Sequence, residues 1–200
     1  MRFCVFPQLS PMSRADIRPT AHVLLLTGAP GVGKTTVMRR VVEALGEHLA
    51  AGFLTDEIRE RGERRGFRLV TLGGREWVMA HVELPKHARV GRYGVDIAAL
   101  DAAAAVALAR RPSIEVYLVD EIGKMECLSA RFVAAMQDLL DSDRVVIATI
   151  ARHGEGFIRA VKARPDCVLL EVTRANRDRL AAEVLAWLAE RAPRRHDNGS

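Results

Sequence analysis

The stretch GAPGVGKTT, from Gly28 to Thr36, restricts the fold of this chain more than any other part of the sequence. It fits the pattern G-x-x-x-x-G-K-[ST] in full, and a short apolar run, Val23 to Leu26, precedes it. After it, apolar residues recur every four positions from Val37 to Leu49, as on one face of an amphipathic helix. This order predicts a buried strand of a parallel sheet, a glycine-rich turn and a helix over about residues 35–50.

A turn of this kind has the chemistry of a phosphate site. Its glycines let successive backbone N–H groups turn toward phosphate oxygens without a Cβ in the way. Lys34 can reach the β and γ phosphates, Thr35 opens the helix with a hydroxyl suited to Mg²⁺, and Thr36 can support the α phosphate. Mg²⁺ is therefore the expected cofactor. The predicted nucleotide-binding residues are Gly28, Ala29, Pro30, Gly31, Val32, Gly33, Lys34, Thr35 and Thr36.

A second stretch, YLVDEIGKMEC from Tyr117 to Cys127, ends an apolar run with two adjacent carboxylates. Carboxylates at the edge of a core need a cation, hydrogen bonds or a catalytic role. We expect Asp120 to end a strand adjacent to the first strand and to hold Mg²⁺ there. Successive strand residues point to opposite faces, so Glu121 has a different expected role: it orients and deprotonates the attacking water. The alternative for Glu121 is a helix-capping or surface acid.

The rest of the chain alternates between strand and helix patterns. The segment 52–72 reads as a hairpin with a charged turn at 62–66, and further strands are indicated at 76–82, 115–120, 144–150 and 167–172. Helix patterns follow the N-caps Asp96 and Ser129, cover 156–164 and include Leu180 to Leu188. The alternation predicts an α/β fold with a mainly parallel sheet flanked by helices and an added β-hairpin.

The length of 200 residues allows one domain with a sizeable core. We place this domain at residues 21–190, between a flexible N-terminal extension at 1–20 and a flexible C-terminal tail at 191–200. No apolar run is long enough to span a membrane. The three cysteines have no C-x-x-C spacing, which favours reduced thiols in a cytoplasmic protein over a disulfide framework or a zinc site. We expect a monomer.

The net charge of +5 raises the question of nucleic-acid binding. Part of this charge lies in the two ends of the chain, and glutamates alternate with the arginines of the predicted hairpin. Aromatic residues for base stacking are scarce there. The hairpin arginines are Arg59, Arg61, Arg64, Arg65 and Arg68. A solvated hairpin is favoured, and nucleic acid remains a partner that the sequence permits but does not favour.

The two motifs occur in order with GFLTDEI, RRGFRLVTL, VGRYGVD and EVTRANRD. This set resembles the nucleoside-triphosphatase family that includes the human cancer-related nucleoside triphosphatase and its thermophile relatives. The resemblance covers about Val23 to Leu188 and implies a compact RecA-like P-loop fold. It also implies slow, Mg²⁺-dependent hydrolysis of ATP, GTP and other nucleoside triphosphates to the diphosphate and phosphate. Lys34 and Glu121 are then the expected catalytic residues, and Thr35 and Asp120 the expected metal-side residues.

Accessory roles for other residues rest on less specific patterns. Arg92, in the VGRY motif, is a candidate to neutralise charge in the transition state, with a surface position as the alternative. Lys124 could pair with Glu126 behind the acidic pair, and Thr149 could sense the γ phosphate from a strand end.

The motif TRANRD has two interpretations. Its Asn176 and Arg177 could bind the base, but Thr173 and Asn176 also have the spacing of a helix N-cap, and the N-cap interpretation is favoured.

Two other function classes remain open from the sequence. A nucleoside, nucleotide or polynucleotide kinase would use the same phosphate loop, although the hairpin follows the first helix too early to be the usual lid. A nucleotide-switched module that binds RNA or protein would show little turnover without its partner.

Overall fold

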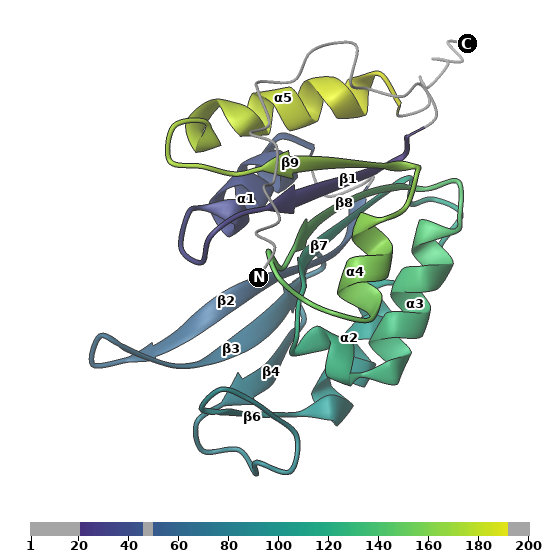
Figure 1. Cartoon of the computed structure of the whole chain (residues 1–200). Coiled ribbons are helices and arrows are strands. Elements are labelled where there is room, and N and C mark those ends of the chain that lie inside the picture. Colours follow the sequence, from purple (N-terminus) through teal and green to yellow (C-terminus); the bar gives the residue numbers. More distant parts are fainter. Residues whose placement is uncertain (1–20, 46–49, 192–200) are drawn as a thin grey trace, which may run out of the picture.

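The structure is a computed structural model and describes residues 21–45 and 50–191. Across these residues, nine strands form one sheet in the order β5-β6-β4-β3-β2-β7-β8-β1-β9 (Figure 1). The strands β2, β7, β8, β1 and β9 run parallel, and β3, β4, β6 and β5 continue the sheet with antiparallel pairing. The predicted α/β fold with its mainly parallel sheet is confirmed, and its antiparallel extension is larger than one hairpin.

The bounds of the strands are as follows: β1 Val23–Thr27, β2 Ala50–Glu60, β3 Glu63–Thr71, β4 Glu76–His81, β5 Arg89–Val90, β6 Tyr93–Val95, β7 Val116–Ile122, β8 Val145–Ile150 and β9 Cys167–Glu171. The helices are α1 Lys34–Leu45, α2 Ile97–Ala107, α3 Ala130–Leu140, α4 Phe157–Lys162 and α5 Arg177–Ala189, with a 3₁₀ turn η2 at Glu126–Leu128.

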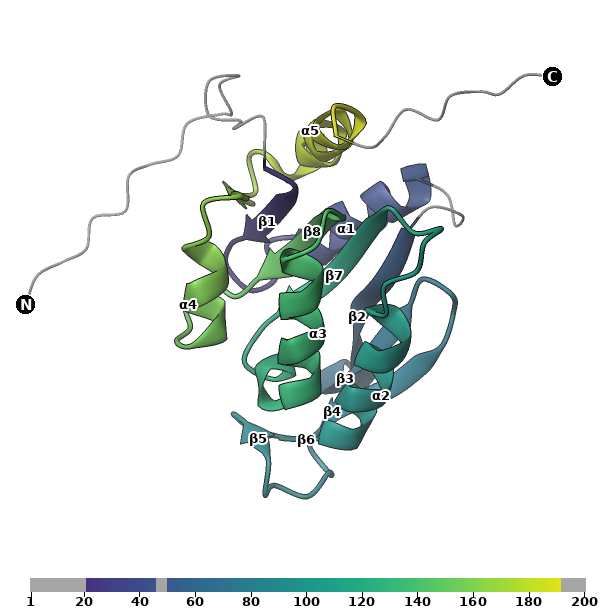
Figure 2. The same ribbon diagram turned by 90° about the vertical axis from the view of Figure 1, so that its right-hand side faces the viewer.

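Helices cover both faces of the parallel part of the sheet. Side chains alternate along β1: Val23 and Leu25 pack into one hydrophobic cluster, and Leu24 and Leu26 pack into the other. The helices α1 and α5 lie together on one face, and α2, α3 and α4 cover the other (Figures 1 and 2). The two clusters explain why these strands read as continuous apolar runs, since each is buried on both faces.

Several helix and strand boundaries in the structure differ from the predicted ones. The first helix was expected to extend to about residue 50, but Ala50 begins β2, because its backbone pairs with Val116 of β7. The hairpin turn is tighter than the predicted 62–66. It consists of Arg61 and Gly62, both at positive φ (48° and 83°), and β3 starts at Glu63. The patterns did not indicate β5 and β6, which form around the VGRY motif.

The N-terminal segment 1–20 and residues 192–200, both expected to be flexible, lie outside the described residues. Arg191, which we assigned to the tail, packs on the domain instead. Its guanidinium lies 4.5 Å from the Trp187 ring centroid and donates a 2.7 Å hydrogen bond to the carbonyl of Ala21. Within 21–45 and 50–191, no helix combines the length and apolar character needed to cross a membrane.

Candidate active site

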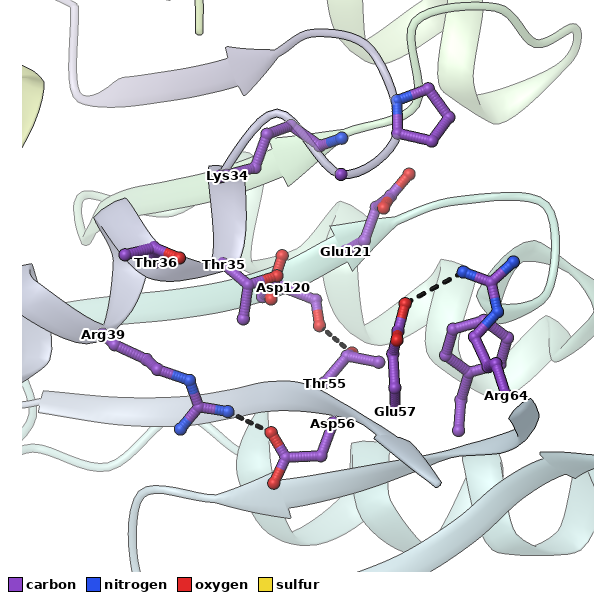
Figure 3. A pocket seen from close by; sticks show the side chains of 14 residues that line it. Lys34, Thr35, Thr36, Arg39, Thr55, Asp56, Glu57, Arg64, Asp120 and Glu121 are labelled. Carbon is purple, nitrogen blue, oxygen red and sulfur yellow. Dashed lines mark hydrogen bonds and ion pairs between the residues drawn. The ribbon is translucent and has the colours of Figure 1, made fainter. Parts of the chain in front are cut away.

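A cavity of about 540 Å³ opens at the carboxyl ends of the parallel strands, where the predicted phosphate loop meets β2, β3 and β7 (Figure 3). Its lining brings together the loop, the two carboxylates of β7 and part of the hairpin. The residues that line it are Pro30, Gly31, Gly33, Lys34, Thr35, Thr36, Arg39, Thr55, Asp56, Glu57, Arg64, Phe67, Asp120 and Glu121. Segments far apart in the sequence thus form one polar site.

The phosphate loop connects β1 to α1 as the sequence predicts. Gly28 has φ +153°, and a Cβ on it would lie 2.5 Å from the carbonyl oxygen of Val172, so no other residue fits there without a shift of the backbone. The Nζ of Lys34 donates a 3.2 Å hydrogen bond to the Gly28 carbonyl, which holds the ammonium over the loop. Backbone N–H groups, a helix N-terminus and an ammonium are therefore gathered in one place, as an anion site requires.

The strand that carries Asp120 is not adjacent to β1, contrary to our expectation. β8 lies between them, and a side chain of β8 contacts Asp120. Thr149 of β8 is fully buried and donates a 2.6 Å hydrogen bond from Oγ1 to Oδ1 of Asp120. The Thr55 hydroxyl donates to the Asp120 backbone carbonyl. Asp120 is thus fixed from β8 and β2, and Thr149 is its support rather than part of the cavity lining.

The surroundings of Asp120 suit a cation. Its side chain is 2 % exposed, and burial raises the pKa of its carboxyl, while the hydrogen bond from Thr149 and the nearby Thr35 hydroxyl act in the opposite direction. Its second oxygen, Oδ2, is buried and has no hydrogen-bond partner among the described residues. An unpartnered buried carboxylate oxygen beside a threonine hydroxyl at the phosphate loop fits Mg²⁺, which binds to one or two carboxylates, waters and phosphate oxygens.

No cluster of three His, Cys, Asp or Glu side chains suited to a metal occurs within residues 21–45 and 50–191.

Glu121 lines the same cavity as Asp120, although a regular strand would direct them to opposite faces. The reason is a bulge. Val119 pairs with Ala148 and Ile122 pairs with Ile150, so three steps along β7 match two steps along β8. Burial raises the pKa of the Glu121 carboxyl. The positive charges of Lys34 and Lys162 act against this rise, and the charge of Asp120 adds to it. A carboxyl tuned in this way, beside the phosphate loop, has the environment of a general base.

The hairpin contributes a cation that we had predicted to be solvated. Arg64 of β3 lines the cavity, and Glu57 of β2 holds its guanidinium through a 2.9 Å hydrogen bond (Figure 3). Its Nε donates a 3.0 Å hydrogen bond to the hydroxyl of Tyr93, and its guanidinium lies 5.1 Å from the Phe67 ring centroid. Arg39 of α1 lines the opposite wall, where it pairs with Asp56. One of the five hairpin arginines is thus directed to the site.

Comparison with known proteins places this geometry in a family. A family model described as NTPase matches residues 23–185. The chain belongs to the NTPase family. A nucleoside-triphosphatase THEP1 from Thermotoga sp. (strain RQ2) is 39 % identical over 166 residues, which cover 82 % of this chain and 94 % of that protein.

Two solved structures of NTPase-family relatives have the same fold. The crystal structure of THEP1 from Aquifex aeolicus matches with a TM-score of 0.76 at 33 % identity, over 83 % of this chain and 98 % of that one. The solution structure of a human cancer-related nucleoside triphosphatase matches with a TM-score of 0.71 at 33 % identity, over 84 % of this chain and 97 % of that one. The resemblance inferred from the motifs is confirmed.

Two accessory candidates of this NTPase-family chain lie outside the phosphate cavity. Arg92 forms the β5–β6 turn with Gly91; it stacks on the Tyr93 ring at 5.3 Å and donates to the carbonyl of Arg64. Arg92 therefore braces the strand that carries Arg64. Lys124 is exposed and forms no ion pair with Glu126, contrary to the pairing we considered.

The TRANRD motif of the family member combines a cap with a contact to the loop. Thr173 and Asn176 bond each other reciprocally, N–H to side-chain oxygen, at 2.8 and 3.3 Å, which is the pairing of a capping box, although α5 begins only after Asn176 and the Asn176 side chain makes no cap hydrogen bond to it. Arg177 lies along the phosphate loop, with its NH1 3.4 Å from the carbonyl of Val32. Together with Arg40 and Thr36, Arg177 lines a separate, smaller cavity of about 260 Å³ beside the loop.

Glu126 is the other acid of the DEIGKME motif, and it is 4 % exposed in η2. Burial, together with the charges of Glu121 and Asp120, raises its pKa to about 8, against hydrogen bonds from backbone N–H groups. At neutral pH Glu126 is therefore a buried neutral acid. The sequence pattern did not indicate this burial, because Lys124, two residues earlier, suggested an ion pair at an exposed turn.

The raised pKa of Glu126 predicts a pH-dependent stability. Its contribution is fully present below the unfolded pKa of about 4.5 and is lost as pH rises to about 8, because the unfolded chain releases the proton first. Each unit of pH in this window costs about 1.4 kcal/mol. We expect Glu126→Gln to weaken the fall in the free energy of unfolding between pH 5 and 8, as measured by urea titration. Glu155→Gln, on the surface, should leave the fall unchanged, and an equally steep fall in Glu126→Gln would contradict the assignment.

Proposed function

We propose that this chain hydrolyses nucleoside triphosphates to the diphosphate and phosphate, with Mg²⁺ bound at Thr35 and Asp120. The observation that carries the proposal is the convergence of Lys34, Asp120 and Glu121 on one cavity at the phosphate loop. The names of the family relatives, nucleoside-triphosphatases, support the same activity. The family also supports an enzyme rather than a passive nucleotide switch.

The proposed mechanism assigns each side chain one task. The loop backbone and Lys34 bind and orient the phosphates, and Glu121 accepts the proton of the attacking water. Mg²⁺, when bound, neutralises phosphate charge as it develops in the transition state. Arg64 faces the same cavity from β3 and stabilises negative charge on the transferring group, a task that we first considered for Arg92. Thr149 and Thr55 fix the carboxylate and the backbone of Asp120.

Broad base specificity and slow turnover are part of the proposal. The cavity beside Thr36, on the other side of the loop, is lined by Gly33, Thr36, Val37, Arg40, Arg177 and Asp178. Its two arginines carry long, adaptable side chains, and Arg40 lies 3.5 Å from Asp178. A site that binds mainly the triphosphate discriminates little between bases.

We also propose a cytoplasmic location, which the free thiols of Cys127 and Cys167 support.

Phosphate release from ATP, GTP, CTP and UTP, with Mg²⁺ or with EDTA and no second substrate, tests the proposed function. We expect release from all four nucleotides, with rates within about tenfold of each other, and none with EDTA. Nucleotide binding without phosphate release would overturn the hydrolase assignment. Phosphate release from one nucleotide alone would overturn the proposed broad base specificity.

The role of Arg64 predicts a loss of rate without a loss of fold. Arg64→Ala should lower kcat about 100-fold, the usual cost of removing a charge-stabilising group from a transition state. Arg64→Lys should recover little of it, because the ammonium cannot make the forked contacts of the guanidinium with Glu57 and Tyr93.

Arg65→Ala is the matched control for Arg64, because Arg65 lies on the same strand, pairs with Glu60 and Glu83 and does not line the cavity. Steady-state phosphate release measures the effect. Equal rates for the Arg64 and Arg65 variants would show that Arg64 does not act on the phosphates.

A further inference from the structure

A cavity of about 280 Å³ adjoins the phosphate site and has no part in the proposed hydrolysis. It shares three lining residues with the phosphate cavity: Thr55, Phe67 and Glu121. Its remaining lining comes from β4, β5, the turn after β7 and the segment after β8: Met79, Val90, Gly123, Lys124, Met125, Glu126, Ala151 and His153. Glu121 therefore stands between two spaces, with the phosphate loop on one side and this second cavity on the other.

The size of the second cavity exceeds what hydrolysis needs. A water molecule occupies about 30 Å³ in the liquid, and hydrolysis places a single water opposite the γ phosphate. The cavity is several times larger and lies just below the usual range of about 300–1,000 Å³ for small-molecule sites, which suits a small ligand. Its volume thus fits a second reactant better than one water.

The lining of the second cavity combines apolar side chains with the carboxyls of Glu121 and of the buried Glu126. Phe67, Val90, Met125 and Ala151 pack against the hydrophobic cluster that contains the buried Met79. Methionine side chains adapt to ligands of varied shape, and an aromatic ring offers a stacking surface. The exposed Lys124 and His153 are at the rim. These properties select an organic molecule with an apolar body, and the polar group of that molecule would then face Glu121.

We propose that the second cavity binds a small primary alcohol with an apolar body and that the protein transfers the γ phosphoryl group to its hydroxyl. The hydroxyl oxygen attacks the γ phosphorus, and the bond from this phosphorus to the β,γ-bridging oxygen breaks. The bridging oxygen leaves with the nucleoside diphosphate, the hydroxyl proton passes to Glu121, and the product is a phosphate monoester. The inference rests on the phosphate site and base of the proposed function and adds an acceptor that competes with water.

Benzyl alcohol is a suitable probe of the class, because its ring fits the apolar lining and it carries one primary hydroxyl. The protein is incubated with ATP, Mg²⁺ and benzyl alcohol, and ³¹P NMR quantifies benzyl phosphate and inorganic phosphate. Bound next to the γ phosphate, the alcohol should yield at least about tenfold more monoester than its mole ratio to water predicts. A yield of benzyl phosphate no higher than the mole ratio of alcohol to water predicts would overturn the proposal.

Two variants with the same substitution test where the alcohol binds. Val90→Trp places an indole in the second cavity and leaves the lining of the phosphate cavity intact. Val78→Trp is the matched control, because Val78 is 47 % exposed on β4 and lines neither cavity. Val90→Trp should reduce monoester formation to the mole-ratio share and keep inorganic phosphate release, and Val78→Trp should keep both. Equal monoester yields in the two variants would overturn the location.

Binding is measured separately, by saturation-transfer NMR of benzyl alcohol with the ADP-bound protein. We expect a signal in the parent and in Val78→Trp and its loss in Val90→Trp. Binding without monoester formation overturns the acceptor role. Phosphate release without binding or monoester overturns the inference and leaves the hydrolase in place. Monoester without release to water supports the inference and refutes the proposed hydrolysis.

Discussion

Glu121→Gln is expected to lower kcat for phosphate release by about 10²–10⁴-fold, because the amide cannot accept the proton of the attacking nucleophile. The substitution keeps the shape of the side chain. Within the described part of the chain, no hydrogen bond or ion pair of Glu121 would be broken by it. Nucleotide affinity should therefore stay close to that of the parent protein, and the unfolding temperature should stay level or rise, because the amide removes a buried charge. The variant would be a protein that binds its substrate and does not turn it over.

The matched control for Glu121 is Glu155→Gln, which makes the same change on the surface, where Glu155 pairs only with Arg159. Its kcat should equal that of the parent. Since burial raises the pKa of Glu121, the acid limb of the parent's kcat/KM profile should lie above the usual range of a glutamate. Stopped-flow phosphate release, with fluorescent nucleotide for binding, gives all three quantities. An unchanged kcat in Glu121→Gln would remove this residue from the mechanism.

Asp120→Asn should move activity and stability in opposite directions. The buried carboxyl of Asp120 has a raised pKa and an oxygen without a partner, so the charged form destabilises the metal-free protein above the carboxyl's unfolded pKa. The neutral amide removes that charge, and we expect the metal-free variant to have a higher free energy of unfolding at pH 7 than the parent. Activity with Mg²⁺ should fall about 100-fold or more, because the amide is a poor magnesium ligand.

Ligand-dependent melting separates the two effects at Asp120. In the parent, Mg²⁺ with ADP at about 100 times its Kd should add roughly 2.7 kcal/mol of stability. In Asp120→Asn most of this addition should disappear. Thr149→Val is the informative companion, because it removes the hydroxyl that bonds Oδ1 and leaves the charge. It should lower stability, unlike Asp120→Asn. An Asp120→Asn protein that is less stable without metal and fully active with it would refute the metal-side assignment.

The local parts of this site could be predicted from the sequence, because adjacent residues form them. The phosphate loop, its strand and its helix occupy about twenty consecutive positions, and their conformation follows from glycines and hydrophobic periodicity. The two carboxylates at the end of β7 were likewise visible as an interruption of an apolar run. Their shared orientation was not, because it depends on a bulge set by pairing with β8.

The missed parts depend on pairing between distant segments. Arg64 belongs to a run of alternating charges that reads as solvated, and the pairing of β3 with β2 directs this arginine of the hairpin into the cavity. The insertion of β8 between β7 and β1 makes Thr149 a partner of Asp120, although 29 positions separate them. The burial of Glu126 follows from the 3₁₀ turn after β7, for which no pattern in the sequence gave a signal.

The main sheet holds the hairpin at one end, and beyond that end the side chains of Arg92 and Tyr93 contact Arg64. β2 pairs with β7 no further than Phe53, and β3 pairs with β4 from Gly66 onward, so the ribbon between them projects beyond the main sheet (Figure 1). Glu57 and Arg64 lie on this projecting part, whose tip is the turn at Arg61 and Gly62. A two-stranded ribbon that the sheet holds at one end bends when a force acts on its tip. A molecule bound at this turn would thus shift the Arg64 guanidinium, against its contacts with Tyr93 and Arg92, without entering the cavity.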